Sequence, residues 1–270
     1  MRLFTAVHKD TELQYMRDYK PHREDVQHLR VLVHGPVGAG KSSFINSVNS
    51  VLRGKITGRP LAEANASESF TKKYKTYKIQ KGQPGNFYHF VFNDTMGVEM
   101  EEDGGVHPED IILAMKGHMR DGYRFKPGSK LSEDNQFYNA EPTLNDKVQV
   151  LVCVVPADKI PLLTDGCVKK IKDIREMASE LEIPQLAIIT KIDLACPQIQ
   201  KDLKNVYLSK KLKETMEQFS QLVGIPMSYI FPVKNYDEEI NIKDDVDSLI
   251  LSALRQIIDF GEEFINDMET

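Results

Sequence analysis

Long apolar runs, paired cysteines and an excess of basic charge are all missing from this 270-residue sequence. No stretch approaches the ~20 apolar residues of a membrane-spanning helix, and the first residues lack the apolar core of a signal peptide. The three cysteines, Cys153, Cys167 and Cys196, form no C-x-x-C pair, and an odd number does not build a disulfide framework. We therefore expect a cytoplasmic protein of a reducing compartment with no membrane segment.

Charge and composition narrow the class further. A net charge of −5 gives no reason to expect a nucleic-acid surface, so we predict no nucleic-acid partner. A hydrophobic content of 41% is enough to bury one sizeable core. No internal repeat, low-complexity tract or linker interrupts the chain. We expect an N-terminal arm or helix in residues 1–27, followed by a single domain in residues 28–270.

Short apolar runs alternate with amphipathic stretches, which predicts a mostly parallel sheet covered by helices. The expected strands span 29–34, 72–80, 87–93, 148–155, 185–190 and 229–233. A short Gly/Pro loop joins the second and third of these, and predicts an antiparallel hairpin at the sheet edge. The expected helices span 42–52, 108–119, 165–181, 201–223 and 243–266. Residues 10–28 are expected to form a helix or an extended arm, and 120–147 a long surface loop.

A phosphate-binding pattern, G-x-x-x-x-G-K-[ST], lies between the first predicted strand and the first predicted helix after it. Glycines let the backbone curl so that successive N–H groups point at one phosphate, and the helix directs its positive dipole end at the same anion. Lys41 can reach the β- and γ-phosphates, and the Ser42 hydroxyl can bind Mg²⁺. The predicted nucleotide-binding residues are Gly35, Pro36, Val37, Gly38, Ala39, Gly40, Lys41, Ser42 and Ser43.

A second motif, Asp94-Thr95-Met96-Gly97, closes the predicted strand 87–93. We predict that Asp94 holds Mg²⁺, directly or through water, and that the Gly97 N–H senses the γ-phosphate. D-x-x-G alone is weak evidence because Asp and Gly are common in turns, but its place at a strand end strengthens it. The preceding loop, 53–70, is the expected switch. The candidate for a second Mg²⁺ hydroxyl is Thr71, with Thr57, Ser67 and Ser69 as alternatives.

A third motif, Thr190-Lys191-Ile192-Asp193, follows the predicted strand 185–190. Guanine presents two donors on one edge, and a single carboxylate accepts both in parallel charge-assisted bonds. Adenine lacks that pair, so Asp193 predicts guanine selectivity, while the stem of Lys191 can cover the base plane. The last predicted strand runs into Val233-Lys234-Asn235, whose N–H groups could meet the guanine oxygen.

The four stretches GPVGAGKS, DTMG, TKID and VKN each follow a predicted strand, where ligands bind in such sheets. Together they resemble the P-loop GTPases of the Ras-like class, with a three-layer α/β fold and a six-stranded, mainly parallel sheet. The longer strings HGPVGAGKSSFINSVNSVLRG, NDTMGVE and FPVKNY resemble the interferon-induced protein 44 and 44-like family. That resemblance runs from about His28 to the C-terminus. Longer members of the family carry an additional N-terminal domain that we do not find here.

The resemblance implies GTP or GDP and Mg²⁺ as cofactors, a cytoplasmic location and a role in the interferon or antiviral response. Protein partners or self-association are expected alongside the guanine nucleotide. Two departures from the general GTPase pattern matter. Thr190 stands where Ras-like proteins usually have Asn, which weakens the expected affinity, and Val98 stands where many have a water-orienting Gln. Hydrolysis should be slow unless Glu99, Glu101, a partner or a dimer supplies the missing group.

Two other functions stay open from the sequence. A nucleotide-binding scaffold that never hydrolyses GTP is favoured by Val98. An ATP-binding protein of the same P-loop superfamily is opposed by Asp193, because adenine offers that carboxylate no matching pair of donors.

Overall fold

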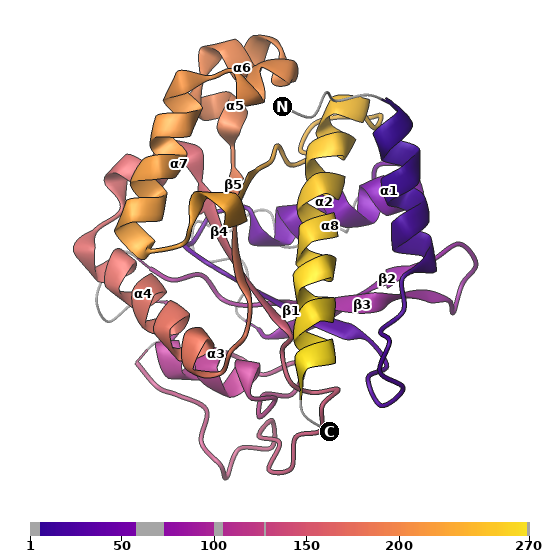
Figure 1. Cartoon of the computed structure of the whole chain (residues 1–270). Helices are drawn as coiled ribbons and strands as arrows, with labels where there is room; N and C mark the ends of the chain where they lie inside the picture. Colours follow the sequence, from indigo (N-terminus) through magenta and orange to yellow (C-terminus); the bar gives the residue numbers. More distant parts are fainter. Residues whose placement is uncertain (1–5, 58–72, 100–104, 127, 269–270) are drawn as a thin grey trace.

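A six-stranded sheet forms the middle layer of the protein (Figure 1). The computed structural model describes residues 6–57, 73–99, 105–126 and 128–268. Across the sheet the strands run in the order β2-β3-β1-β4-β5-β6, and β2 lies antiparallel to β3 while the other neighbours are parallel. This confirms the predicted α/β fold with an antiparallel edge strand. The strands are β1 (Leu29–His34), β2 (Lys75–Gln80), β3 (Phe87–Asp94), β4 (Val150–Pro156), β5 (Gln185–Thr190) and β6 (Ile230–Pro232).

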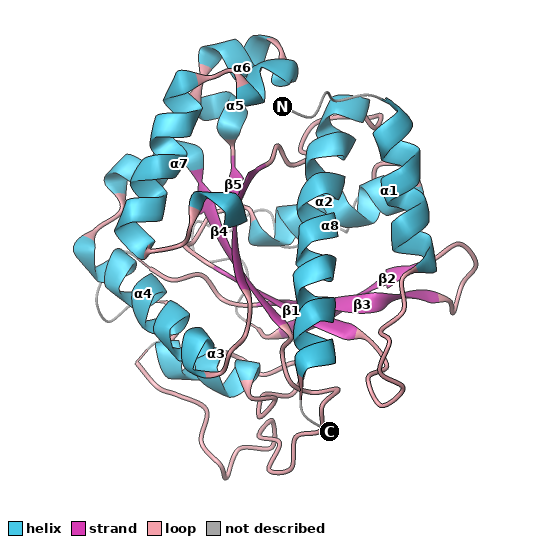
Figure 2. Cartoon of the chain, in the orientation of Figure 1, coloured by secondary structure: helices cyan, strands magenta, loops and turns pink. Residues whose placement is uncertain are grey.

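Helices cover both faces of the sheet (Figure 2). One layer consists of α1 (Ala6–Asp18), α2 (Lys41–Arg53) and α8 (Asp244–Asp267). The other consists of α3 (Pro108–Met115), α4 (Asp165–Glu180) and α7 (Lys210–Val223). Short helical turns, η2 (Ala157–Leu162), α5 (Ile192–Ala195), α6 (Pro197–Lys201), η3 (Leu203–Tyr207) and η4 (Met227–Tyr229), connect the layers. In the described part of the chain, no helix is long and apolar enough to cross a membrane.

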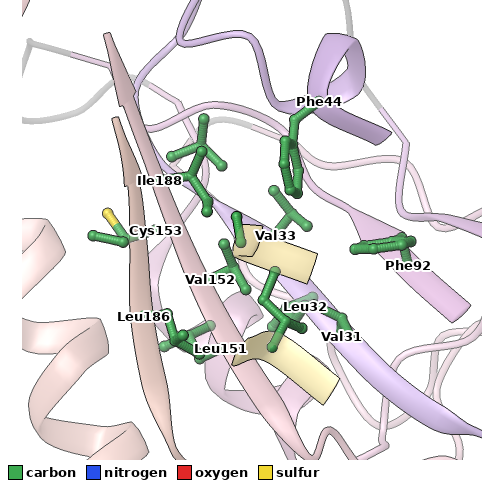
Figure 3. Close-up of a cluster of buried hydrophobic side chains, with 14 of the residues drawn as sticks. Val31, Leu32, Val33, Phe44, Phe92, Leu151, Val152, Cys153, Leu186 and Ile188 are labelled. Carbon is green, nitrogen blue, oxygen red and sulfur yellow. The ribbon is translucent and has the colours of Figure 1, made fainter. Parts of the chain in front are cut away.

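The core lies on both faces of the central strands. β4 is buried along its whole length, as expected for a near-continuous apolar run in a parallel sheet covered on two sides. From α2, Phe44 packs edge-on against Phe92 of β3, with ring centroids 6.3 Å apart. Figure 3 shows Phe44 in this cluster beside Val33 and Phe92. The packing fixes the start of α2, and so the loop before it, against the sheet.

One predicted helix is broken. The pattern at 201–223 predicts a continuous helix, but only α7, from Lys210, is regular. The Asp202 side chain accepts a hydrogen bond from the Lys204 N–H and starts η3, and the Ser209 hydroxyl accepts from the Leu212 N–H and starts α7. Asp and Ser favour such capping positions over helix interiors, so the local side-chain bonds end one element and begin the next.

The N-terminal helix α1 packs along α8 (Figure 1). Lys9 Nζ lies 2.5 Å from an oxygen of Asp247, and the Tyr19 hydroxyl donates to Glu262 over 2.8 Å. The helix ends at Asp18, and the connection to β1 then runs as loop rather than as one helix across 10–28. The described part of the predicted N-terminal arm thus packs against α8 of the domain. The domain boundary between residues 27 and 28 stays a prediction.

The expected surface loop, 120–147, contains no regular helix or strand among its described residues, yet it is folded onto the domain. Tyr123, Phe125 and Leu131 are buried. The N–H of Tyr74, just before β2, donates to the Tyr123 carbonyl over 2.7 Å, and the Leu131 N–H donates to Asp110 of α3 over 2.7 Å. The segment therefore joins the start of β2 to α3.

Candidate functional site

The loop between β1 and α2 has the curled backbone that the G-x-x-x-x-G-K-[ST] pattern predicts. Gly35, Gly38 and Gly40 all have positive φ, which side-chain-bearing residues rarely adopt. A Cβ on Gly35 would lie 2.1 Å from the carbonyl oxygen of Val154 in β4. The loop can therefore lie this close to the sheet only with glycine at that position.

Lys41 is buried in this loop. Its ammonium donates to the carbonyl oxygens of Gly35 and Pro36, each over 3.0 Å. Burial lowers the pKa of Lys41 to about 8, against the raising effect of the nearby Asp94 carboxylate. The Lys41 side chain thus reaches from the start of α2 across the loop. Because its positive charge is poorly solvated there, an anion bound in the loop would interact with it strongly.

The two predicted Mg²⁺ ligands described by the structure are in direct contact. The Ser42 hydroxyl, at the start of α2, donates a hydrogen bond to Oδ2 of Asp94, at the end of β3. Asp94 is fully buried. A hydroxyl and a carboxylate oxygen at the mouth of a phosphate loop match the oxygen donors that Mg²⁺ takes in phosphate sites, so the residues present fit this ion.

The D-x-x-G segment is paired with the phosphate loop. The Val37 N–H donates to the Val98 carbonyl and the Val98 N–H donates to the Gly35 carbonyl, each over 3.0 Å. A Cβ on Gly97 would lie 2.6 Å from the Val37 side chain, so the motif glycine permits this approach. Val98 is 1% exposed, which makes it a packed residue of the loop contact rather than one that could orient water.

The loops that follow β5 and β6, here called the base loops, carry the third and fourth motifs. Both contact the phosphate loop at Ala39 and Gly40. The Thr190 hydroxyl, at the end of β5, donates to the Ala39 carbonyl over 2.6 Å. The Asn235 side-chain amide, after β6, donates to the Gly40 carbonyl over 3.1 Å. Thr190 stands where Ras-like proteins usually have Asn, and its single hydroxyl makes one contact with the phosphate loop. The Asn235 amide makes a second contact with the same loop. Sequence reasoning assigned Asn235 only a backbone role, because nothing local in the sequence indicates which partner its amide meets.

Asp193 and Lys234 bring the third and fourth motifs together. Lys191 adopts a left-handed conformation with φ of 53°, which turns the chain sharply from β5 into α5. Asp193 follows on α5 with its side chain 23% exposed, and its Oδ2 lies 4.0 Å from Lys234 Nζ. The ammonium of Lys234 is closer to Glu239, at 2.5 Å. Glu239 belongs to the acidic run 237–239, which in the sequence has the pattern of an ordinary solvated loop.

The remaining predicted residues divide into three groups. Ser43 is exposed at the start of α2, and Val233 is buried with its N–H donating to the Ile189 carbonyl over 2.8 Å. Thr57 bonds Asn49 and Ser50 near the far end of α2, so it does not join Ser42. The other proposed metal or catalytic candidates, Thr71, Ser67, Ser69 and Glu101, lie outside the described residues.

Tyr236, which directly follows the fourth motif, anchors the last loop through its backbone and its side chain. The Tyr236 N–H donates to the Ser47 hydroxyl on α2 over 2.9 Å. The Tyr236 hydroxyl donates to the buried Asp247 of α8 over 2.6 Å, and Asp247 in turn pairs with Lys9 of α1. The loop that follows β6 is therefore held between α2 and α8.

Comparison with solved structures agrees with this fold. The crystal structure of Toc33 from Arabidopsis thaliana in complex with Mg²⁺ and GMPPNP aligns with 96% of this chain and 94% of that chain. The TM-score is 0.50 at 16% sequence identity, which is evidence for a shared fold. No family model matches the chain.

Curated relatives are more similar in sequence. The chain is 34% identical to interferon-induced protein 44 of Mus musculus over 263 residues, which cover 97% of this chain and 62% of that protein. It is 31% identical to interferon-induced protein 44-like of Homo sapiens over 261 residues, covering 97% of the chain and 58% of that protein. The chain thus spans about six tenths of the length of these relatives. Over nearly its whole length, it is a homologue of the interferon-induced protein 44 and 44-like proteins.

Proposed function

We propose that this chain binds GTP or GDP together with Mg²⁺, with the loop 35–42 around the phosphates and Asp193 on the guanine edge. The observation that carries the proposal is the bracing of one loop by both base loops. Thr190 bonds Ala39 and Asn235 bonds Gly40, so the backbone that would hold phosphate is tied directly to the two loops that would hold the base. Preorganised contacts of this kind reduce the ordering that binding would otherwise require.

Each residue has a distinct part in the proposed site. The backbone N–H groups of the loop and the Lys41 ammonium bind the phosphates, and Gly97 meets the γ-phosphate. Ser42 and Asp94 would hold Mg²⁺, which when bound neutralises charge on the β- and γ-phosphate oxygens. Lys191 covers the base plane, and the backbone N–H groups of Lys234 and Asn235 meet the guanine oxygen, since the Val233 N–H is already bonded to the Ile189 carbonyl. Thr71 remains the candidate for a second metal ligand.

Hydrolysis by the isolated chain is slow in this proposal. Val98 occupies the position after the motif glycine, and its buried side chain cannot polarise water. A water-orienting group would have to come from Glu99, Glu101, a protein partner or a second copy of the chain. The same observation favours the second candidate, a nucleotide-binding scaffold that does not hydrolyse GTP.

The names of the relatives support the wider setting. We propose that the chain acts in an interferon-induced, antiviral response as a nucleotide-dependent switch or assembly protein. A cytoplasmic location is part of the proposal, and it is supported by three buried cysteines that are free thiols.

Isothermal titration calorimetry with GDP, GMPPNP and ATP, each with Mg²⁺, tests the central claim. We expect binding of both guanine nucleotides and ATP binding at least a hundredfold weaker. Equal or tighter binding of ATP would remove the guanine assignment, and no binding of any nucleotide at millimolar concentration would remove the phosphate site as well.

The substitution Asp193→Asn tests the base reader. An amide cannot accept both guanine donors, so GDP affinity should fall by about a hundredfold, as two charge-assisted bonds are disrupted. Xanthosine diphosphate should bind better to the variant than to the wild type. Asp134→Asn, at an exposed residue of the 120–147 segment, is the matched control and should leave both affinities unchanged. If Asp193→Asn keeps wild-type preference, another group reads the base.

Single-turnover phosphate release separates the slow GTPase from the scaffold. We expect release over hours from GTP-loaded protein, faster at high protein concentration if a second copy contributes. No release above the rate of buffer hydrolysis, at any protein concentration, would leave the scaffold.

A further inference from the structure

Lys234 lies between two carboxylates that hold it very unequally. Its Nζ is 2.5 Å from Oε1 of Glu239 and 4.0 Å from Oδ2 of Asp193. The Glu239 distance is that of a direct charge-assisted hydrogen bond, whereas the Asp193 distance is too long for one. The ammonium therefore stands next to the proposed base reader without binding it.

Glu239 is fixed in place by its own surroundings. Its side chain is 11% exposed, and Oε2 accepts a hydrogen bond from the Asp237 N–H over 3.0 Å. Lys243 Nζ lies 3.7 Å from Oε1 and adds a second cation. Burial alone would raise the pKa of Glu239, but the Asp237 N–H and the Lys234 ammonium lower it to about 2. The carboxylate is thus ionised and oriented throughout the neutral range.

The longer distance from Lys234 to Asp193 matters because the Asp193 carboxylate must accept two parallel N–H donors from guanine in the proposed function. A lysine in direct contact with Asp193 would occupy lone pairs on one oxygen and would have to be displaced before guanine could bind. A lysine held at 4.0 Å leaves both oxygens open and still keeps a positive charge beside the carboxylate.

We propose that Glu239 is a positioning residue for guanine recognition, because it holds Lys234 away from Asp193 and so keeps the base reader open. The inference rests on the proposed function, since it requires that Asp193 binds guanine. It adds a selectivity determinant from a loop that none of the four motifs includes.

The test is a small set of variants titrated with GDP and ADP, each with Mg²⁺. In Glu239→Gln, Lys234 loses its anionic partner and should settle on Asp193. GDP affinity should fall about tenfold, the loss of roughly one hydrogen bond to a charged group, while ADP affinity stays within twofold. Glu238→Gln, at the exposed neighbour, is the matched control and should bind like wild type.

The double variant Lys234→Met/Glu239→Gln separates positioning from a general disturbance of the loop. With the competing ammonium gone, GDP affinity should return to within about threefold of wild type. In an Asp193→Asn background, Glu239→Gln should have no further effect, because the lysine then has no carboxylate to block. A loss shared equally by GDP and ADP, or a double variant as weak as the single, would overturn the inference.

Failure of the inference and failure of the proposed function give different results. If wild type shows no preference for GDP over ADP and Asp193→Asn changes nothing, the guanine assignment itself is wrong. If both behave as expected and Glu239→Gln binds GDP like Glu238→Gln, only the positioning role is wrong. Should Glu239→Gln not fold, Glu239→Asp takes its place, because the shorter side chain withdraws the carboxylate from Lys234: a loss of affinity for GDP alone supports the inference, and an equal loss for GDP and ADP, or no loss, overturns it.

Discussion

Replacing Lys41 with Met should stabilise the nucleotide-free protein while abolishing nucleotide binding. The ammonium is buried, with the residue 6% exposed, and its pKa is lowered from 10.5 to about 8. A displacement of that size corresponds to about 3 kcal/mol of lost stability at neutral pH, because the folded state disfavours the charged form. Methionine keeps a similar stem and removes the charge.

Part of this gain is offset. The carbonyls of Gly35 and Pro36 lose the ammonium that donates to them, which costs about 1 kcal/mol for each bond. The net expected gain is about 1 kcal/mol, and a chain of this length should convert it to a rise in Tm of about 2 °C. Calorimetric melting of nucleotide-free protein at pH 7 measures it. The exposed Lys172→Met is the control and should leave Tm unchanged.

The dependence on pH provides a second check on the same lysine. Since the folded pKa lies below the unfolded one, the burial cost is present in full below about pH 8 and is lost as the pH rises toward 10.5. The Tm difference between Lys41→Met and wild type should therefore shrink between pH 8 and pH 10. A variant that melts below wild type at pH 7, or a difference that grows with pH, would refute the reasoning.

Two further substitutions test the framework of the site. Gly35→Ala should lower the free energy of unfolding in urea by about 4 kcal/mol, because φ is positive there and the new Cβ would lie 2.1 Å from the Val154 carbonyl oxygen of β4. Gly82→Ala, at a positive φ with open space around it, is the control and should cost about 1 kcal/mol. Equal costs would show that the loop is not pressed against the sheet. Asp247→Asn removes a fully buried negative charge 2.5 Å from Lys9 and should lower the free energy of unfolding by about 2–3 kcal/mol in the same assay. The cost is smaller than that of breaking an isolated buried ion pair, because Lys9 keeps its contact with Asp244. A change below 0.5 kcal/mol would mean that α1 is held by other contacts.

The 120–131 part of the long loop illustrates where sequence reasoning stops. Its Pro, Gly and polar residues have no clear period, so nothing indicates which surface it contacts. The structure buries Tyr123 and Leu131 and ties them to Tyr74 and Asp110. Those partners are distant in sequence, and a non-periodic segment carries no pattern that reports its side of contact.

The residues of the phosphate loop, in contrast, can be predicted from the sequence. The glycines, Lys41 and Ser42 can be assigned from the sequence, because a curled backbone that leads into a helix depends on a few adjacent residues and their allowed φ angles. The strands could also be assigned, since β1 and β5 begin and end where the apolar runs predict. Chemistry that depends on contiguous residues can thus be predicted from the sequence alone.

Tertiary structure alone decided which side chains support that chemistry. The Asn235 amide meets Gly40 across 195 residues of chain, and Glu239 captures Lys234 instead of Asp193 by a difference of 1.5 Å between two contacts, 2.5 and 4.0 Å. Both outcomes follow from where packing brings the end of β6 relative to α2 and β5. Hydrogen bonds and ion pairs depend on distance at this scale, and a linear sequence specifies such distances only through the completed fold.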